Sequence, residues 1–269
     1  MTASGRHLTS PATELAAAMP SWASLVLAPN PGPMTLDGTN TWLLRADGHQ
    51  GCVVVDPGPA DESHLAALVT TPVDLVLITH SHLDHTESVD RIVELTGAAV
   101  RAADPRWCRG GGQPLTDGEE IAAGGVRMRV LAVPGHTADS VAFVVTGDEP
   151  AVLTGDTVLG RGTTVVTWPD GDLGDYLASL RKLAELGPIP VLPGHGPVLA
   201  DCAAAAEFYY AHRMERLDQV RRALAAGAST AAEVVAQVYA DVDRALWPAA
   251  EMSVRAQLAY LRQNPGEAP

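Results

Sequence analysis

Residues 79–87 read THSHLDHTE, and six consecutive positions of this stretch contain three histidines and an aspartate, which are of types that bind metal ions: His80, His82, Asp84 and His85. The stretch follows residues 73–79 (VDLVLIT), whose apolar content predicts a fully buried strand. Because His80 and His82 are two residues apart, an extended chain directs both imidazoles to one face. Asp84 and His85 come after the turn and can reach a neighbouring point. One six-residue stretch can therefore supply two ligands to each of two metal ions.

Two ligands per ion are too few, so the sequence should contain distant ligands as well. His136 in VPGHTADS and His195 in LPGHGPV each follow Pro-Gly at the end of a predicted strand, where glycine lets the backbone turn sharply. Between them, Asp156 in LTGDTVLG is a carboxylate suited to bridging two cations. The alternative is a set of ordinary loop histidines. Composition alone produces the H-x-H-x-D-H spacing on the order of once per thousand such chains, which favours the metal site.

The overall composition indicates a globular protein with one sizeable core and a small appendage. The chain has 269 residues with 18 basic and 32 acidic side chains, a net charge of −14. This charge repels nucleic acid and anionic membranes at long range, so we expect neither a DNA nor a membrane partner, although a local patch could still bind RNA.

The cysteines and the N-terminus bear on the cellular compartment. Cys52, Cys108 and Cys202 are far apart and form no C-x-x-C pair, so neither a zinc ribbon nor a disulfide framework is expected. The N-terminal MTASGRHLTSPATELAAAMP lacks an apolar signal-peptide core, and no apolar run approaches eighteen residues. We therefore expect a cytoplasmic protein. The sequence does not fix the oligomeric state.

Short apolar runs between turn residues predict strands along the first 200 residues. The expected strands are 24–28, 41–45, 51–55, 73–79, 125–133, 140–146, 151–153 and 190–192. The expected helices are 61–70, 87–96 with Thr86 as N-cap and Gly97 at its end, and 172–186. Strand–helix alternation in both halves argues for an α/β fold with two sheets or one large mixed sheet.

After about Asp201 the pattern changes to helices without strand signals. The three expected helical segments are 201–226, 230–241 and 249–263. We therefore divide the chain into a catalytic domain, residues 1–200, and a small C-terminal helical domain, residues 201–269.

The motifs resemble those of a known family. THSHLDH, PGHT, GDT and PGHG follow one another as in the metallo-β-lactamase superfamily. Residues 30–42 (NPGPMTLDGTNTW), 155–166 (GDTVLGRGTTVV) and 172–180 (DLGDYLASL) resemble the branch typified by β-lactamase-like protein 2 and related fungal thioesterases. The resemblance covers about residues 20–200 strongly and the tail weakly. It implies a four-layer αββα sandwich, with two sheets face to face and helices outside, and a winged-helix-like tail.

The resemblance also implies how the ligands divide between two metal ions. It assigns His80, His82 and His136 to the first ion, Asp84, His85 and His195 to the second, and Asp156 to the bridge. Asp56 in VVVDPG matches an aspartate of the family pattern and is expected to fix imidazole tautomers. A plain turn aspartate before Pro-Gly is the alternative.

We expect two Zn²⁺ ions, with iron or manganese as alternatives, and a metal-bridging hydroxide as the nucleophile. Asp84 is the expected catalytic residue, because it can ligate metal, orient the hydroxide and pass a proton to the leaving group. Antibiotic-degrading members of the superfamily are usually exported, and many use cysteine where this chain has Asp156. A true β-lactamase is therefore not expected.

Residues for substrate binding are less defined by the sequence. Four candidates for a cleft lie in the loop after Asp156: Arg161, Thr163, Thr164 and Trp168. Tyr209, with Tyr210 and His212 nearby, could reach the same cleft from the first tail helix. Packing within the loop and the helix is the alternative for both groups.

One arginine cluster bears on RNA binding: Arg213, Arg216, Arg221 and Arg222. It could follow phosphates, or it could be a solvated helical face in which Glu215 and Asp218 alternate with the cations. The chain ends at RQNPGEAP soon after the third helical segment, which leaves little sequence for a β wing and puts nucleic-acid binding by the tail in doubt.

Three functions remain open. The first is a hydrolase of a small or carrier-bound ester or thioester, which the acidic charge favours. The second is a zinc-dependent endoribonuclease acting on single-stranded RNA, as known in the same branch. The third and weakest is a metal-dependent binding or regulatory protein, because binding modules rarely need a complete hydrolytic centre.

Overall fold

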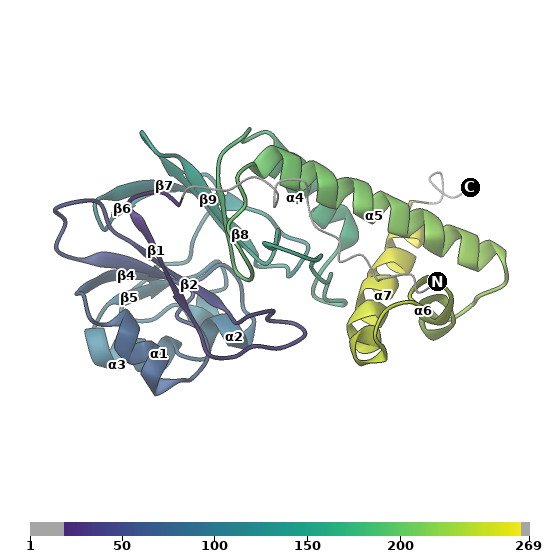
Figure 1. Cartoon of the computed structure of the whole chain (residues 1–269), viewed down its shortest axis with the longest axis horizontal. Coiled ribbons are helices and arrows are strands. Elements are labelled where there is room, and N and C mark those ends of the chain that lie inside the picture. The colour runs from purple at the N-terminus through teal and green to yellow at the C-terminus, as the bar shows by residue number, and fades with distance from the viewer. Residues whose placement is uncertain (1–18, 265–269) are drawn as a thin grey trace, which may run out of the picture.

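A computed structural model of the chain describes residues 19–264 (Figure 1). Two five-stranded sheets pack face to face, and helices cover their outer surfaces. The expected αββα sandwich is therefore confirmed. Most of the N-terminal segment examined for a signal peptide, and the end of RQNPGEAP, lie outside the described residues.

The first sheet has the order β1-β2-β3-β4-β5, with antiparallel pairing from β1 to β3 and parallel pairing from β3 to β5. Its strands are β1 (Ala23–Leu27), β2 (Asn40–Leu44), β3 (Cys52–Val55), β4 (Val73–Leu77) and β5 (Ala99–Arg101). Its helices are α1 (Glu62–Leu68), α2 (Leu83–Thr86) and α3 (Val89–Thr96), and α1 and α3 bury Leu65, Leu68 and Ile92 against the sheet.

The second sheet has the order β10-β9-β8-β7-β6, in which only β10 and β9 are parallel. Its strands are β6 (Glu120–Ala123), β7 (Val126–Ala132), β8 (Val141–Thr146), β9 (Ala151–Gly155) and β10 (Val191–Pro193). A short 3-10 helix, η2 (Pro105–Trp107), precedes β6, and α4 (Leu173–Ala184) covers the outer face. Trp42 and Leu77 of the first sheet meet Met128 and Phe143 of the second in the core between the sheets.

Helix boundaries follow from local capping. The Asp61 carboxylate accepts a hydrogen bond from the His64 N–H at the start of α1, and the Asp172 carboxylate accepts one from the Asp175 N–H at the start of α4. Gly97 ends α3 at a φ of 69°, as expected. Thr86 is not the N-cap that we expected, because the chain forms the short helix α2 over Leu83–Thr86 first and α3 begins after Ser88.

Two further expectations about the strands were wrong. The strand β4 is not fully buried, because Asp74 is exposed and only Val76 and Leu77 at its end are buried. The short strands β5 and β6 were not expected, since three and four residues give little alternation to detect.

The tail consists of α5 (Cys202–Ala225), α6 (Ala231–Val238), the 3-10 helix η3 (Arg244–Leu246) and α7 (Trp247–Gln263). The first half of α5 packs on α4 within the core of the second sheet, and its second half forms a separate core with α6 and α7. The division expected at residue 200 thus falls where a helix shared by both cores begins. Helix α7 starts at Trp247, earlier than expected, because Pro248 is tolerated in a first turn.

No strand occurs in the tail up to residue 264. None of the helices within residues 19–264 is both long enough and apolar enough to span a lipid bilayer.

Candidate metal centre

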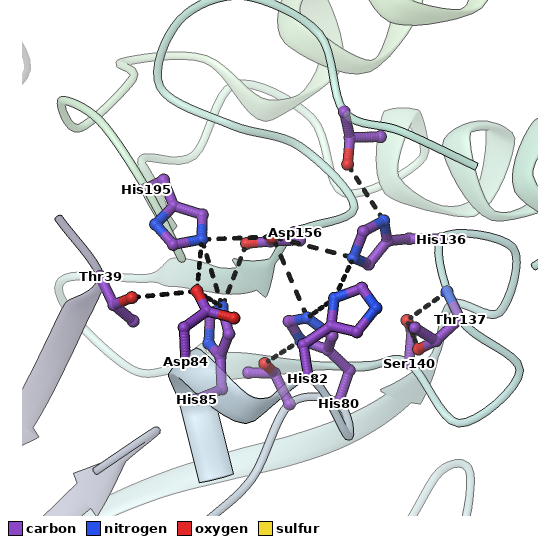
Figure 2. A network of polar contacts seen from close by, with 12 residues as sticks. Thr39, His80, His82, Asp84, His85, His136, Thr137, Ser140, Asp156 and His195 are labelled. Atoms are coloured by element: carbon purple, nitrogen blue, oxygen red, sulfur yellow. Dashed lines mark hydrogen bonds and ion pairs between the residues drawn. The ribbon is translucent and has the colours of Figure 1, made fainter. Parts of the chain in front are cut away.

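The ends of four strands meet at one edge of the sandwich and bring the predicted ligands together (Figure 2). His80 follows β4, His136 follows β7, Asp156 follows β9 and His195 follows β10. The seven side chains form two groups whose donor atoms lie within 4.8 Å of one another. The groups are His80, His82, His136 and Asp156, and Asp84, His85 and His195.

In the first group, three imidazole nitrogens converge. Nε2 of His80 and Nε2 of His136 each lie 3.1 Å from Nδ1 of His82. Ligands about 2.0 Å from a tetrahedral zinc ion are roughly 3.3 Å apart, so these spacings match the edges of such a site.

The second group has the same dimensions. Nε2 of His85 and Nε2 of His195 lie 3.3 Å apart. Oδ2 of Asp84 lies 3.3 Å from the first and 3.2 Å from the second. Two imidazoles and one carboxylate therefore surround a second point at which a cation would fit.

Asp156 lies between the two groups. Its Oδ2 is 3.3 Å from Nε2 of His195 and 3.7 Å from Nε2 of His136, and its Oδ1 is 3.6 Å from Nε2 of His85. Oδ1 is buried and has no hydrogen-bond partner among the described residues. A metal ion between the two groups would satisfy this buried oxygen, so the residues present fit a metal ion.

Hydrogen bonds fix the tautomers of four of the five imidazoles. In each, Nδ1 lies within 3.1 Å of an oxygen: Thr79 Oγ1 for His80, Asp56 Oδ2 for His85, the Val165 carbonyl for His136 and the Gly38 carbonyl for His195. The Thr79 hydroxyl donates to Asp56, so it accepts from His80. Since each Nδ1 carries the proton, each Nε2 presents a lone pair to the centre of the site. The facing Nε2 atoms of His85 and His195, 3.3 Å apart, repel one another as lone pairs unless a proton or a metal ion lies between them.

Asp56 organises this arrangement from a strained position. Its φ is 55°, and it is buried at the end of β3. One oxygen accepts the Thr79 N–H at 2.8 Å, and the other accepts the Thr79 hydroxyl at 2.7 Å and Nδ1 of His85 at 2.9 Å. These contacts favour tautomer control over the plain turn aspartate, and we retain that role as a proposal.

Burial and charge separate the pKa values of the cluster. Burial lowers the pKa of His136 to about 4 and keeps the pKa of His80 well below its usual range. Burial also disfavours the charged form of His195, but Asp156 and Asp84 outweigh it and raise that pKa to about 10. Imidazolium charge on His85 and His195 in turn holds the pKa of Asp84 well below its usual range, although burial opposes this shift. At neutral pH, protons on His195 and His85 thus balance the carboxylates when no metal is bound.

The two Pro-Gly-His turns need glycine for different reasons. Gly135 has a φ of 130°, and a Cβ there would lie 2.3 Å from the backbone of Tyr176. Gly194 is not in a left-handed conformation. A Cβ on Gly194 would lie 2.4 Å from Oδ1 of Asp156 and 2.9 Å from the His85 ring, so any side chain would enter the metal centre.

The structure places the loop candidates in different settings. Arg161 forms an exposed, bidentate ion pair with Asp37 of the β1–β2 loop. Thr163 is half-buried. Thr164 is buried with its hydroxyl 3.2 Å from Nδ1 of His136, so it supports a ligand and does not line a cleft. Trp168 is half-buried and lines a cavity of about 410 Å³ with residues of α6 and α7.

The expectation that Tyr209 lines the cleft was wrong. Tyr209 is 1% exposed, and its hydroxyl binds both the N–H and the carbonyl of Leu159. The ring packs between α5 and the second sheet. Tyr210 lies beside Arg181, and His212 is largely buried without a hydrogen-bond partner among the described residues.

The arginine cluster is neither a phosphate track nor a solvated face. Arg213 is 3% exposed and donates to the Thr164 carbonyl. Arg216 lies over the Tyr239 ring and donates to the Val238 carbonyl, and Arg221 pairs with Asp218. Of the four, Arg222 alone is exposed to solvent.

The sequence argument missed the residues that hold the ligands. Thr39 donates to Oδ2 of Asp84 at 3.0 Å, and Thr79 lies between His80 and Asp56. Both lie in stretches that we singled out for other reasons, DGTNTW and THSHLDH. The carbonyls of Gly38 and Val165 carry no side-chain signal at all.

Comparisons with known proteins agree with this geometry. A model described as "Metallo-beta-lactamase superfamily" matches residues 34–195, and one described as "Beta-lactamase associated winged helix domain" matches residues 230–264. The Beta-lactamase-like protein 2 homolog of Caenorhabditis elegans is 34% identical over 88% of this chain and 82% of its own length.

A second relative carries the name of an enzyme. The Atrochrysone carboxyl ACP thioesterase of Aspergillus fumigatus is 34% identical over 80% of this chain and 72% of its own length. A solved structure of a metallo-beta-lactamase family protein from Thermus thermophilus superposes with a TM-score of 0.78 at 27% identity, covering 92% of this chain and 95% of that one.

Proposed function

Because the chain belongs to the metallo-beta-lactamase superfamily, in the branch of the β-lactamase-like protein 2 homologues, we propose that it is a dinuclear zinc hydrolase of carrier-bound acyl thioesters. The observation that carries the metal-dependent part is the convergence of five imidazoles and two carboxylates on two neighbouring points. Family membership supports the hydrolytic part, and it sets aside a purely regulatory role.

The proposed ligands are those of the two groups, with Asp156 shared between them. When bound, two divalent cations would lower the pKa of water and polarise the carbonyl oxygen of the substrate. Thr79, Asp56 and the Val165 and Gly38 carbonyls keep the imidazoles in the tautomer that binds metal. Asp56 and Thr79 therefore act on the imidazoles and do not contact the substrate.

Asp84 is the proposed proton carrier. Its side chain is 26% exposed, whereas those of His85 and His195 are 0% and 1% exposed, so Asp84 faces the side from which substrate arrives. Thr39 and the two imidazoles all bind its Oδ2, which leaves Oδ1 without any of these contacts (Figure 2). That oxygen is free to take up the proton that the attacking water loses and to pass it to the departing thiolate.

The surroundings of the site favour an acyl substrate. Leu83, between two of the ligands, is 65% exposed, so apolar surface adjoins the metal centre. The relative named as an acyl carrier protein thioesterase supports a carrier-bound acyl group as the substrate class.

RNA cleavage is the second candidate, and the structure offers it little support. The net charge of −14 opposes a polyanion. Three of the four clustered arginines are committed to protein groups, as described above, and are not free to follow phosphates.

One experiment separates these functions. Protein loaded with Zn²⁺ is incubated with a series of acyl thioesters and, separately, with unstructured RNA, and elemental analysis gives the metal content of each sample. We expect thioester hydrolysis, about two metal ions per chain, and loss of both hydrolysis and part of the metal in His82→Ala. RNA cleavage that His82→Ala abolishes, without thioester turnover, would establish the second candidate instead. Loading with Fe²⁺ or Mn²⁺ in parallel identifies the preferred metal.

A further inference from the structure

The loop after β9 supports a metal ligand through its backbone. The Val165 carbonyl lies 2.6 Å from Nδ1 of His136, and the Thr164 hydroxyl lies 3.2 Å from the same nitrogen. The Thr167 N–H also donates to the His136 carbonyl at 3.2 Å. The orientation of the His136 ring therefore depends on where residues 164–167 lie.

Two helices of the C-terminal unit hold this segment. Nη2 of Arg213 in α5 donates to the Thr164 carbonyl. The Val166 N–H donates to Oγ of Ser253 in α7 at 3.3 Å. The C-terminal unit thus binds the residue before Val165 and the residue after it.

Arginine is an unusual residue at a buried position whose only role is packing, and Arg213 occupies a buried position. It is 3% exposed, and the partners of its guanidinium within residues 19–264 are the Thr164 carbonyl and the Tyr176 ring, with no carboxylate among them. Its guanidinium lies over the Tyr176 ring, with Cζ 5.2 Å from the ring centroid, and its Nε has no hydrogen-bond partner in the described structure. Burying a cation without a counter-ion is costly, and an apolar side chain of similar length would avoid that cost.

We infer that Arg213 is a positioning residue for the proposed metal ligand His136, and that it acts by holding the Thr164–Val166 segment with the help of Ser253. The inference rests on the proposed metal-dependent function and deepens it. It makes the C-terminal helices part of the metal centre, although none of them provides a ligand.

Arg213 affects the metal-facing nitrogen of His136 through the Val165 carbonyl. A hydrogen bond to Nδ1 orients the imidazole and raises the basicity of Nε2, so a displaced Val165 carbonyl weakens the nitrogen that faces the metal. Losing such an outer partner costs roughly 10- to 100-fold in metal affinity. Arg213 acts one residue further away, so we expect a loss of about tenfold, at the low end of that range.

The test compares zinc binding by the wild type and Arg213→Met, using competition with a chromophoric chelator. We expect one of the two binding steps, that of the His80, His82 and His136 group, to weaken about tenfold while the other is unchanged. The thermal midpoint of the metal-free variant should be equal to or above that of the wild type, because a buried unpaired cation is removed. Arg222→Met, on the exposed side of the same helix, is the matched control and should bind zinc as the wild type does.

Two further variants keep the test decisive. Arg213→Lys retains a donor and should recover part of the affinity, which a change in packing alone would not produce. Ser253→Ala acts on the same segment from α7, should weaken the same step, and carries the test if Arg213→Met does not fold.

The outcomes divide clearly. Unchanged zinc binding in Arg213→Met, or equal losses at both steps together with a lower midpoint of the metal-free protein, would overturn the inference. Failure of the wild type to bind zinc would instead overturn the proposed function, and the inference with it.

Discussion

The hydroxyl of Thr39 lies 3.0 Å from Oδ2 of Asp84 and donates a hydrogen bond to it. Thr39 is fully buried, and the Asn30 side chain binds it twice, accepting from its N–H at 2.9 Å and donating to its hydroxyl oxygen at 3.0 Å. Because Asn30 donates to that oxygen, the hydroxyl proton is directed at Asp84. The β1–β2 loop thereby fixes the carboxylate proposed to carry the proton.

Thr39→Val keeps the shape of the side chain and removes this donor. A hydrogen bond to a charged group contributes about 1.5–3 kcal/mol, so we expect kcat for the proposed thioester hydrolysis to fall by roughly tenfold or more. The thioester KM should change little, because Thr39 does not face the substrate. Steady-state kinetics check this, and Thr39→Ser, which retains the hydroxyl, should keep most of the activity. A valine variant with wild-type kcat would show that Asp84 needs no such donor.

Asp56→Asn tests control of the tautomer. Asparagine tolerates the φ of 55° at this position, so the backbone should be preserved. The amide either opposes the His85 Nδ1–H with its own N–H or forces the proton onto Nε2, where it blocks metal binding. We expect zinc affinity at the Asp84, His85 and His195 group to fall by roughly 10- to 100-fold in a chelator competition. Asp47→Asn, at an exposed position, is the control and should leave zinc affinity unchanged.

Zinc binding should release protons at neutral pH. In the metal-free protein the carboxylates raise the pKa of His195 to about 10 and that of His85 well above its usual range, against the effect of burial. Both rings are therefore protonated at pH 7 and must lose these protons when Nε2 binds zinc. Affinity should accordingly increase as the pH rises from 7 towards 10. Calorimetry in two buffers of different ionisation enthalpy measures the release, and a binding enthalpy that does not depend on the buffer would contradict this prediction.

The sequence alone predicted much of the fold because the residues that begin and end helices and strands act locally. Gly97 ends α3 where expected, and the apolar runs of β7 and β8 differ from their predicted bounds by a residue. Local sequence patterns fail to predict burial and short strands where these depend on tertiary packing. Asp74 occupies an exposed position in β4 that a nearly continuous apolar run did not reveal, and the three residues of β5 gain their structure from pairing with β4.

The candidate site divides in the same way. Side chains with distinctive chemistry, such as His136 and Asp156, can be recognised from their spacing and their glycines. Backbone carbonyls cannot, and neither can a residue whose role depends on burial. Arg213 belongs to a sequence pattern typical of a charged helical face, and only its packing against Tyr176 distinguishes it from Arg222.

His212 offers a test of stability away from the metal centre. Both ring nitrogens are buried without a hydrogen-bond partner among the described residues. Burial, together with the neighbouring Arg213 and Arg216 cations, lowers the pKa of His212 to about 4. The folded protein therefore holds this ring neutral in a pH range where the unfolded chain protonates it.

His212→Leu should stabilise the metal-free protein and flatten its response to acid. The unfolded chain binds a proton at an ordinary pKa of about 6.5 and the folded chain at about 4, so the wild type loses stability as the pH falls through this window. Removing the imidazole removes that contribution and two unpaired buried nitrogens, which should raise the free energy of unfolding by about 1 kcal/mol at pH 7. Urea unfolding at pH 7.5, 6 and 4.5 with a chelator present measures both effects.

The other buried histidines retain their own dependence on pH, so the slope of the free energy of unfolding against pH should decrease without vanishing. A His212→Leu curve parallel to that of the wild type would show that this ring does not titrate as proposed.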